Sequence, residues 1–380
     1  MSHTGVHYMP EHPRGRVPQP VRHRSTTRRF VTTATIAIGA SLGINAPMIA
    51  RADEGGVSVW LPGFFGSLAA APLQPGWSLQ SIYYHTSVSA GADVSRAREI
   101  TIGQIPLNLN ASLSGSVNAD ADLGLALPTY TFANPVLGGQ ATVGLLTVYG
   151  RTDTSLAASL SGTLTTPLGT LPFARSDSIS DVVWGFGDIY PLATLRWNSG
   201  VNNYITYVFG DVPVGAYDSA RLANIGVGHG AIDAGGGYTY FNPQTGHEIS
   251  GVLGFTYNFI NPSTQYQSGV DMHFDWGASQ FLTKQLQIGV VGYVYDEIGC
   301  DSGSGDRVGC FQSRVAGVGP QLGYIIPLGT LQAYINVKGY GEFAAQNRPH
   351  GWNTWLTVQL AAAPPGAEPP PSATRRMYTK

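Results

Sequence analysis

Residues 269–278 read Gly269-Val270-Asp271-Met272-His273-Phe274-Asp275-Trp276-Gly277-Ala278, and apolar and ionisable side chains alternate along this stretch. Successive side chains of a β-strand point to opposite faces, so one face carries the apolar residues and the other carries Asp271, His273 and Asp275. A soluble sheet can also alternate, but here the pattern recurs along most of the chain without any sign of a helical core. Such recurrence is typical of a transmembrane β-barrel with a polar lumen.

The overall composition agrees with a membrane barrel. Charged residues make up 12% of the 380 residues, which is about half of the share of about 25% in soluble domains. The mean hydropathy of +0.00 is too low for a helical membrane protein, and Gly (49) and Tyr (19) are plentiful. Barrels have this composition because only every second strand residue faces lipid.

The N-terminus has the features of an export signal. Residues 1–29 contain six arginines and one acid, an apolar stretch then runs to Ile49, and Ala50-Arg51-Ala52 provides a cleavage site. We interpret residues 1–52 as a signal peptide and not as a membrane helix, because several Thr and Ser residues dilute the apolar stretch. Its removal takes away seven of the 21 Lys and Arg and one of the 23 Asp and Glu, which leaves a net charge of −8. This charge argues against nucleic acid as a partner.

Beyond the signal peptide the sequence divides into three parts. Residues 53–77 are rich in Gly and Pro and alternate little, so we expect an N-terminal segment that enters the lumen as a plug. Residues 78–361 carry alternating patterns separated by turn signals such as Asn198-Ser199-Gly200. They predict an all-β fold, an antiparallel transmembrane β-barrel of about 12–14 strands, even in number. Residues 362–380 are Pro-rich, and we predict a disordered tail.

Residues 100–170 form a long, extended region that is poor in charge. Within it, the stretch Ala111–Val117 is similar to the stretch Ala158–Leu164. Two interpretations are open. The stretches are arms that pair as a ribbon extending beyond the membrane, or their similarity is a coincidence in a region rich in Ser and Gly.

The two cysteines, Cys300 and Cys310, flank a turn-rich segment between two strand patterns. An exported protein meets oxidising conditions, so we expect a disulfide within this loop. Asp301 and Asp306 raise the alternative of a calcium site, but the ligand spacing and the closing Glu of an EF-hand are missing. We therefore predict neither a metal nor a cofactor.

The polar faces of the predicted strands supply the candidate lumen residues. Asp271, His273 and Asp275 should face the lumen, because ionisable groups on the lipid face are destabilising. Two interpretations are open: a proton-sensitive station on the solute path, or a satisfied network with Arg196 or Lys338 of other strands. The predicted path consists of Arg196, Asp271, His273, Asp275, Gln285, Gln287 and Lys338.

Three aromatic residues stand out in the N-terminal segment, namely Trp60, Phe64 and Phe65. If this segment enters the barrel, they form an apolar plug or a binding patch at the entrance. The alternative is that they anchor the chain at the membrane interface, where exposed Trp is common.

We predict no enzymatic activity. A catalytic triad needs a serine, a histidine and an acid within hydrogen-bonding reach. His273 has an acid two residues away on either side, but the nearest serines, Ser268 and Ser279, are five and six residues along the strand. At the rise of a strand they are out of direct reach.

Three stretches resemble the outer-membrane family named for a meta-pathway of phenol degradation. They are Glu54–Gly63, continued through Pro75–Ser78 to Tyr83-Tyr84; Gly185–Pro191; and the closing Gly351–Leu356. The resemblance implies an outer-membrane barrel. By analogy with hydrocarbon channels of the long-chain fatty-acid transporter type, it also implies uptake of small hydrophobic or aromatic compounds. Within the second stretch we expect Asp188 to bind backbone at a periplasmic turn or bulge.

The sequence thus predicts an outer-membrane channel of a Gram-negative bacterium for passive, selective uptake of small hydrophobic or aromatic compounds. Its partners are the solute and the outer-membrane lipid. Two other functions stay open: a general porin, which would repel anions because the chain is acidic, and a structural or adhesive surface barrel, which the arms in residues 100–170 favour. The alternative fold is a soluble β-sandwich, whose strands would have about five or six residues.

Overall fold

The computed structural model describes residues 58–91, 109–166, 169–306 and 309–365. The predicted signal peptide (1–52) and the predicted tail from residue 366 onward lie outside the described residues. All regular structure that is described is β-strand. In this part of the chain, no helix is long and apolar enough to cross a membrane.

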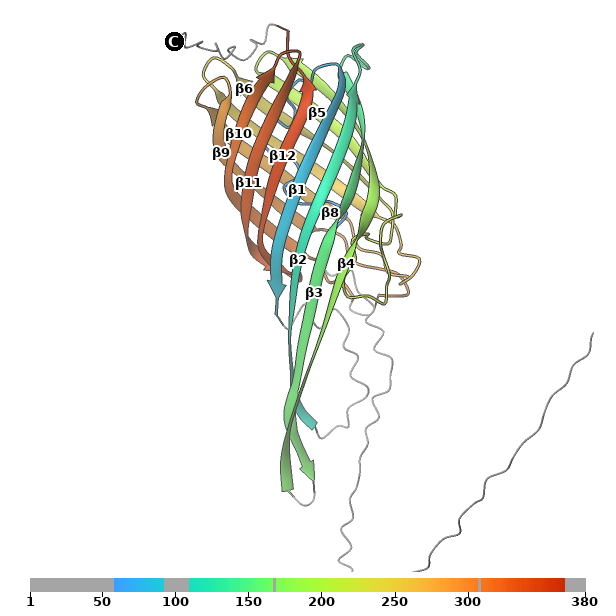
Figure 1. Cartoon of the computed structure of the whole chain (residues 1–380). Helices are drawn as coiled ribbons and strands as arrows, with labels where there is room; N and C mark the ends of the chain where they lie inside the picture. The colour runs from blue at the N-terminus through green and yellow to red at the C-terminus, as the bar shows by residue number, and fades with distance from the viewer. Residues whose placement is uncertain (1–57, 92–108, 167–168, 307–308, 366–380) are drawn as a thin grey trace, which may run out of the picture. The chain divides into compact units, whose positions relative to one another are not determined.

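Twelve strands form one closed antiparallel barrel (Figure 1). Strands adjacent in sequence pair with each other, and the barrel closes where Leu79 of the first strand lies opposite Leu360 of the last. The strands are β1 (Gly76–Ala90), β2 (Leu109–Thr131), β3 (Gln140–Thr166), β4 (Gly169–Ser199), β5 (Asn202–Asp211), β6 (Ala231–Asn242), β7 (His247–Asn258), β8 (Asp271–Phe281), β9 (Leu286–Glu297), β10 (Arg314–Leu328), β11 (Leu331–Gln346) and β12 (His350–Ala362). The predicted fold class is confirmed, and strands of 10 residues or more exclude the sandwich.

The alternation of side chains separates an outer surface from an interior. On β8, Asp275 is buried inside the barrel, whereas Phe274 is 37% exposed on the outside, as the alternation predicts. On β5 the same alternation places apolar Tyr207 and Phe209 inside and leaves Tyr204 exposed. The interior is therefore polar at β8 and apolar at β5, where aromatic residues of the N-terminal segment pack against the wall.

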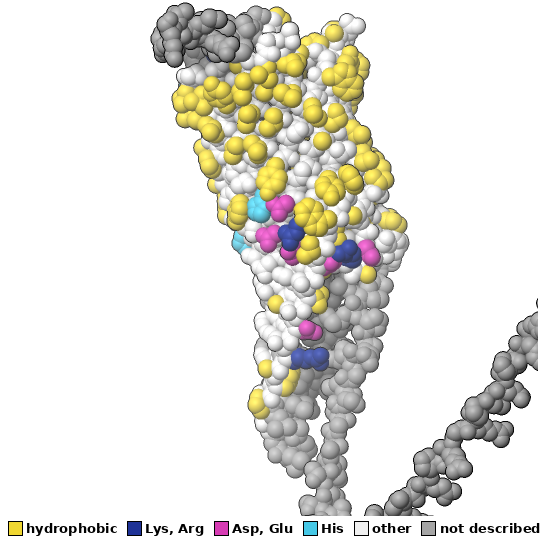
Figure 2. Space-filling view, in the orientation of Figure 1, with side chains coloured by type: hydrophobic (Ala, Val, Ile, Leu, Met, Phe, Trp, Pro, Cys, Tyr) yellow, Lys and Arg dark blue, Asp and Glu magenta, His cyan; other side chains and the backbone are white. Residues whose placement is uncertain are grey.

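Apolar side chains cover the outer surface of the barrel on the face seen in Figure 2. Exposed aromatic residues, Trp77 near one end and Phe186 and Trp352 near the other, delimit this surface. Trp352 pairs with Ser87, ten residues beyond Trp77 on β1. Ten residues of a strand tilted by about 40° span about 25 Å. This height matches the apolar band of transmembrane barrels.

The two ends of the barrel differ in the length of their connections. Two residues join β4 to β5, and two join β10 to β11, at the end where β1 begins and β12 ends. Residues 212–230 and 259–270 form longer connections at the opposite end. Short turns face the periplasm in outer-membrane barrels, and long loops face the exterior. We therefore name these the periplasmic end and the extracellular end.

Strands β2, β3 and β4 extend beyond the other strands as a ribbon at the extracellular end (Figure 1). They contain 23, 27 and 31 residues. The two similar stretches of sequence lie side by side in it, because Ala111 is opposite Gly162 and Ser114 is opposite Ser159. The predicted pairing is confirmed, and β4 adds a third strand that the sequence comparison did not anticipate.

Cys300 and Cys310 form the predicted disulfide in the loop between β9 and β10. The bridge joins two points of one loop, so it constrains the loop and not the barrel wall. We expect Cys300→Ser to leave barrel assembly unchanged, as measured by heat-modifiable electrophoretic mobility, and to increase proteolysis within the loop. Failure of the variant to form a barrel would contradict this prediction.

Candidate functional site

Residues 58–75, here named the inner segment, run through the barrel interior before β1 begins. Trp60 is 1% exposed and Ala70 is fully buried. The aromatic rings of the segment pack against the wall: the ring centroid of Trp60 lies 5.9 Å from that of Tyr207, and that of Phe64 lies 6.5 Å from that of Trp355. Trp60, Phe64 and Phe65 therefore contact aromatic side chains of the barrel wall.

A tight turn at Gly63 allows this packing. The amide of Phe64 donates to the carbonyl of Leu61 at 3.0 Å, and Gly63 has a φ of +88°, which L side chains rarely adopt. A Cβ atom at Gly63 would also lie 2.9 Å from the ring of Tyr340. Glycine is thus required both by the backbone conformation and by the close approach of β11.

Two oppositely charged side chains clamp this turn. Asp275 of β8 accepts hydrogen bonds from the amides of Gly63, at 2.9 Å, and Phe65, at 3.1 Å. Lys338 of β11 donates to the carbonyl oxygens of Gly63, Phe64 and Phe65. Two of the predicted lumen charges, Asp275 and Lys338, are thus bound to the backbone of the inner segment.

The rest of the segment is also bound through its backbone to interior side chains. The amide of Leu68 donates to Glu248 of β7 at 2.9 Å, and the amide of Ala70 donates to Thr239 of β6 at 3.0 Å. Gln140 of β3 both accepts from and donates to the backbone of Leu73. Contacts from this many strands hold the segment against the wall over most of its length.

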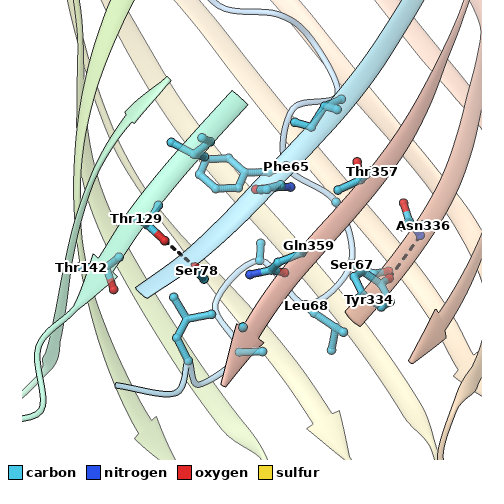
Figure 3. Close-up of a pocket in the computed structure, with 18 of the residues that line it drawn as sticks. Phe65, Ser67, Leu68, Ser78, Thr129, Thr142, Tyr334, Asn336, Thr357 and Gln359 are labelled. Carbon is cyan, nitrogen blue, oxygen red and sulfur yellow. Dashed lines mark hydrogen bonds between the residues drawn. The ribbon is translucent and has the colours of Figure 1, made fainter. Parts of the chain in front are cut away.

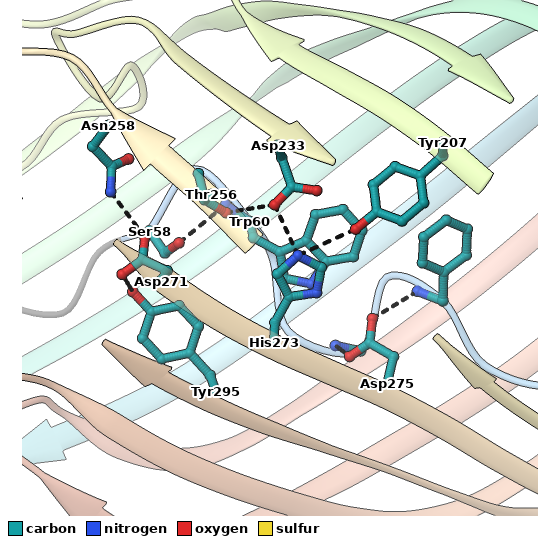
Figure 4. Close-up of polar contacts among 12 residues, drawn as sticks. Ser58, Trp60, Tyr207, Asp233, Thr256, Asn258, Asp271, His273, Asp275 and Tyr295 are labelled. Atoms are coloured by element: carbon teal, nitrogen blue, oxygen red, sulfur yellow. Dashed lines mark hydrogen bonds and ion pairs between the residues drawn. The ribbon is translucent and has the colours of Figure 1, made fainter. Parts of the chain in front are cut away.

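His273 lies at the centre of a buried cluster (Figure 4). Its Nε2 atom is 2.8 Å from a carboxylate oxygen of Asp233 and 3.3 Å from the hydroxyl of Tyr207, and its ring stacks on Trp60 at 3.9 Å. Asp271 belongs to a separate group, because it accepts from Asn258 and Tyr295. The three ionisable residues of β8 thus face the interior together, but each has different partners.

The other predicted lumen residues are placed as follows. Arg196 and Lys338 are buried in the interior, and Gln287 is buried between Ser279 and Tyr334, to which it is hydrogen-bonded. Gln285 differs from the prediction: it lies in the turn before β9 and accepts a hydrogen bond from Tyr324, whose side chain is exposed on the outer surface. The strand begins at Leu286, so the alternation does not extend to Gln285.

An apolar cavity of about 270 Å³, here named the outer chamber, lies on the extracellular side of the inner segment. It is lined mainly by aromatic and aliphatic residues of the segment and the wall, among them Trp60, Phe64, Tyr190, Phe209 and Val227. Val227 comes from the β5–β6 loop, which Asp188 holds in place by accepting from the amides of Gly215 and Val227, both at 2.7 Å. Asp188 thus binds backbone as predicted, at a bulge within β4 where the register with β3 shifts, and not at a periplasmic turn.

A second cavity of about 310 Å³, here named the inner chamber, lies towards the periplasmic end, where β1 begins and β12 ends. Figure 3 shows residues that line it. Its walls combine amide and hydroxyl side chains, including Ser78, Thr129, Asn336, Thr357 and Gln359, with apolar side chains of the inner segment and the wall. Phe64 lines both chambers. The inner segment therefore lies between an apolar chamber and a more polar one.

The sequence did not indicate Asp233, Glu248 or Tyr207 as site residues. Asp233 and Glu248 are buried carboxylates of β6 and β7 that bind His273 and the inner segment. Both residues lie in strands with an alternating pattern, so the sequence could have predicted that their side chains point inward. Their partners were not detectable, because these depend on how distant strands and the inner segment come together.

The closed barrel, its apolar outer belt and its aromatic borders define a transmembrane β-barrel, which places the protein in the outer membrane of a Gram-negative bacterium. The chain belongs to the family described as "Putative MetA-pathway of phenol degradation", which matches residues 95–358 and confirms the predicted resemblance. A comparison with curated proteins gave no match.

Comparison with solved structures supports the fold. An outer membrane channel from Pseudomonas putida F1 is similar with a TM-score of 0.54 at 13% sequence identity, over 76% of this chain and 97% of that chain. The transport unit of the autotransporter AIDA-I from Escherichia coli is more distant, with a TM-score of 0.37 at 9% identity, over 83% and 96%. A FadL homologue from Pseudomonas aeruginosa has a TM-score of 0.34 at 10% identity, over 83% and 96%.

Proposed function

We propose that the protein is a channel through which small hydrophobic or aromatic compounds diffuse across the outer membrane, and that the inner segment is its selective constriction. The observation that carries this proposal is the pair of chambers on the two sides of the segment, with Phe64 shared between them. The similar protein from Pseudomonas putida F1 is described as an outer membrane channel. A general porin, the alternative function, needs a lumen without such a segment.

The outer chamber suits a compound with one aromatic ring. An apolar cavity of about 150 Å³ is large enough to bind benzene, and the outer chamber has about 270 Å³. Its walls include Trp60, Tyr190 and Phe209, which offer ring faces and edges to an aromatic solute. A ring binds there only weakly, because burial of one ring yields only a few kcal/mol. Weak binding suits a channel, since conduction requires that a solute can also leave.

Replacement of Phe64 by Ala tests the constriction. Phe64→Ala removes the side chain shared by the two chambers, so we expect faster passage and weaker discrimination by size. The measurement is the uptake of labelled phenol and naphthalene at limiting concentration, in cells with and without the gene. In the variant, the ratio of naphthalene to phenol uptake should rise severalfold.

Phe255→Ala is the matched control, because Phe255 is exposed on the outer surface and should not influence passage. Equal uptake in cells with and without the gene would overturn the proposed function. If sugars of similar size passed as readily as phenol, the general porin would be the better description.

A further inference from the structure

We propose that the inner chamber binds carboxylate groups, and that the compounds which the channel passes are aromatic carboxylates. This inference rests on the proposed function and specifies its substrate class. Its starting point is the charge of the inner chamber. Arg196 and Lys338 line it, and no Asp or Glu does so among the described residues.

Arg196 is the cation without a counter-charge. Its side chain is only 9% exposed, and its guanidinium donates to the hydroxyl of Thr194 and to the carbonyl of Ala69, the latter at 3.4 Å. The Nε atom has no hydrogen-bond partner within the described part of the chain. Among those same residues, no carboxylate forms an ion pair with Arg196, whereas Arg151 and Arg221 at the surface each have an aspartate partner.

Unlike Arg196, Lys338 has its charge compensated by groups of the protein. Its ammonium donates to three carbonyl oxygens of the inner segment, and Asp275 accepts from amides of the same turn. The positive charge of Lys338 is therefore already offset locally. Arg196 has no such neighbour, and a buried charge without a partner is costly.

A carboxylate in the inner chamber would supply the missing counter-charge. Guanidinium groups bind carboxylates through several charge-assisted hydrogen bonds, and only part of the hydrogen-bonding capacity of Arg196 is used by the protein. Amide side chains of Gln80, Gln332 and Gln359 line the same chamber and can donate to a second oxygen.

The two chambers together define an amphiphilic solute. The outer chamber offers apolar and aromatic walls, and the inner chamber offers a cation surrounded by amides and hydroxyls. A solute whose carboxylate leads and reaches Arg196 while its ring follows through the outer chamber matches this order. The inner chamber thus favours anions although the chain without residues 1–52 carries a net charge of −8. This preference is opposite to that of an anion-repelling porin, one of the alternative functions.

The test is the ion selectivity of the purified full-length protein in planar bilayers. Reversal potentials are measured in gradients of sodium benzoate, sodium gluconate and benzylammonium chloride. We expect benzoate to pass more readily than gluconate or benzylammonium. Arg196→Gln should lower the permeability ratio of benzoate to sodium about tenfold, the loss expected for one charge-assisted contact.

Two further variants make the result specific. Arg196→Lys keeps the charge and should retain most of the benzoate preference, which also shows that the position tolerates substitution. Arg151→Gln removes a surface arginine that pairs with Asp153 and should change nothing. Barrel formation by each variant is confirmed by heat-modifiable mobility.

The outcomes separate this inference from the proposed function. If Arg196→Gln had the same benzoate-to-sodium permeability ratio as the unmodified protein, or if benzylammonium passed as readily as benzoate, the proposed carboxylate site would be refuted. The proposed aromatic channel would be unaffected. If benzoate and gluconate passed equally well, recognition of the ring itself would be wrong, and the proposed function would fall with it.

Discussion

Replacement of Asp275 by Ala should release the inner segment and raise single-channel conductance severalfold, while the barrel stays folded. The variant leaves the buried amides of Gly63 and Phe65 without their acceptor and deprives Lys338 of the nearby negative charge. Each buried donor left without its acceptor costs about 1–3 kcal/mol. A loss of about 3 kcal/mol changes the ratio of bound to displaced segment roughly a hundredfold. Strand pairing of β8 uses backbone groups, so the wall is retained.

The double variant Asp275→Ala/Lys338→Met separates charge balance from backbone contact. Removing both side chains avoids an uncompensated buried charge. The increase in conductance of the double variant should therefore be smaller than the sum of the increases caused by Asp275→Ala alone and by Lys338→Met alone. Asp177→Ala is the control, because Asp177 is exposed on the ribbon and lines neither chamber. If Asp275→Ala conducted like the unmodified protein, this clamp would not be what holds the segment in place.

The faces of the strands were predictable, because the two-residue period of a strand decides which side chains point together. Asp271, His273 and Asp275 of β8 share the interior for this reason. The period does not decide which face is inside, and β5 shows the consequence. Its apolar residues Tyr207 and Phe209 face inward, because aromatic side chains of the inner segment occupy that part of the lumen.

The partners of the site residues were not predictable from the sequence. Asp275 binds Gly63 across 212 residues of sequence, and no local pattern encodes such a contact. His273 has an acid two residues away on either side of its own strand, but the carboxylate that contacts it is Asp233 of β6. Gln285 was misplaced because the alternation was extended beyond the first residue of β9.

Gly63→Val tests the inner segment without altering any charge. Valine would have to adopt the left-handed conformation at φ +88°, which costs roughly 1–2 kcal/mol. Its Cβ would meet the ring of Tyr340 at 2.9 Å, and such overpacking costs roughly 1–3 kcal/mol more. We therefore expect a displaced segment and a conductance approaching that of Asp275→Ala.

Two companion variants divide this effect into its causes. Gly63→Val/Tyr340→Ala removes the steric contact and keeps the backbone strain. Its conductance should therefore lie between that of Gly63→Val and that of the unmodified protein. Gly200→Val places the same strain, at φ +62° with no atom near its Cβ position, in the β4–β5 turn, and should leave conductance unchanged. If Gly63→Val itself conducted like the unmodified protein, the close fit of the turn against β11 would not control passage. Because Gly63 carries no side chain that could contact a solute, an increase in conductance identifies the position of the segment, and not the charge of the lumen, as what restricts flow.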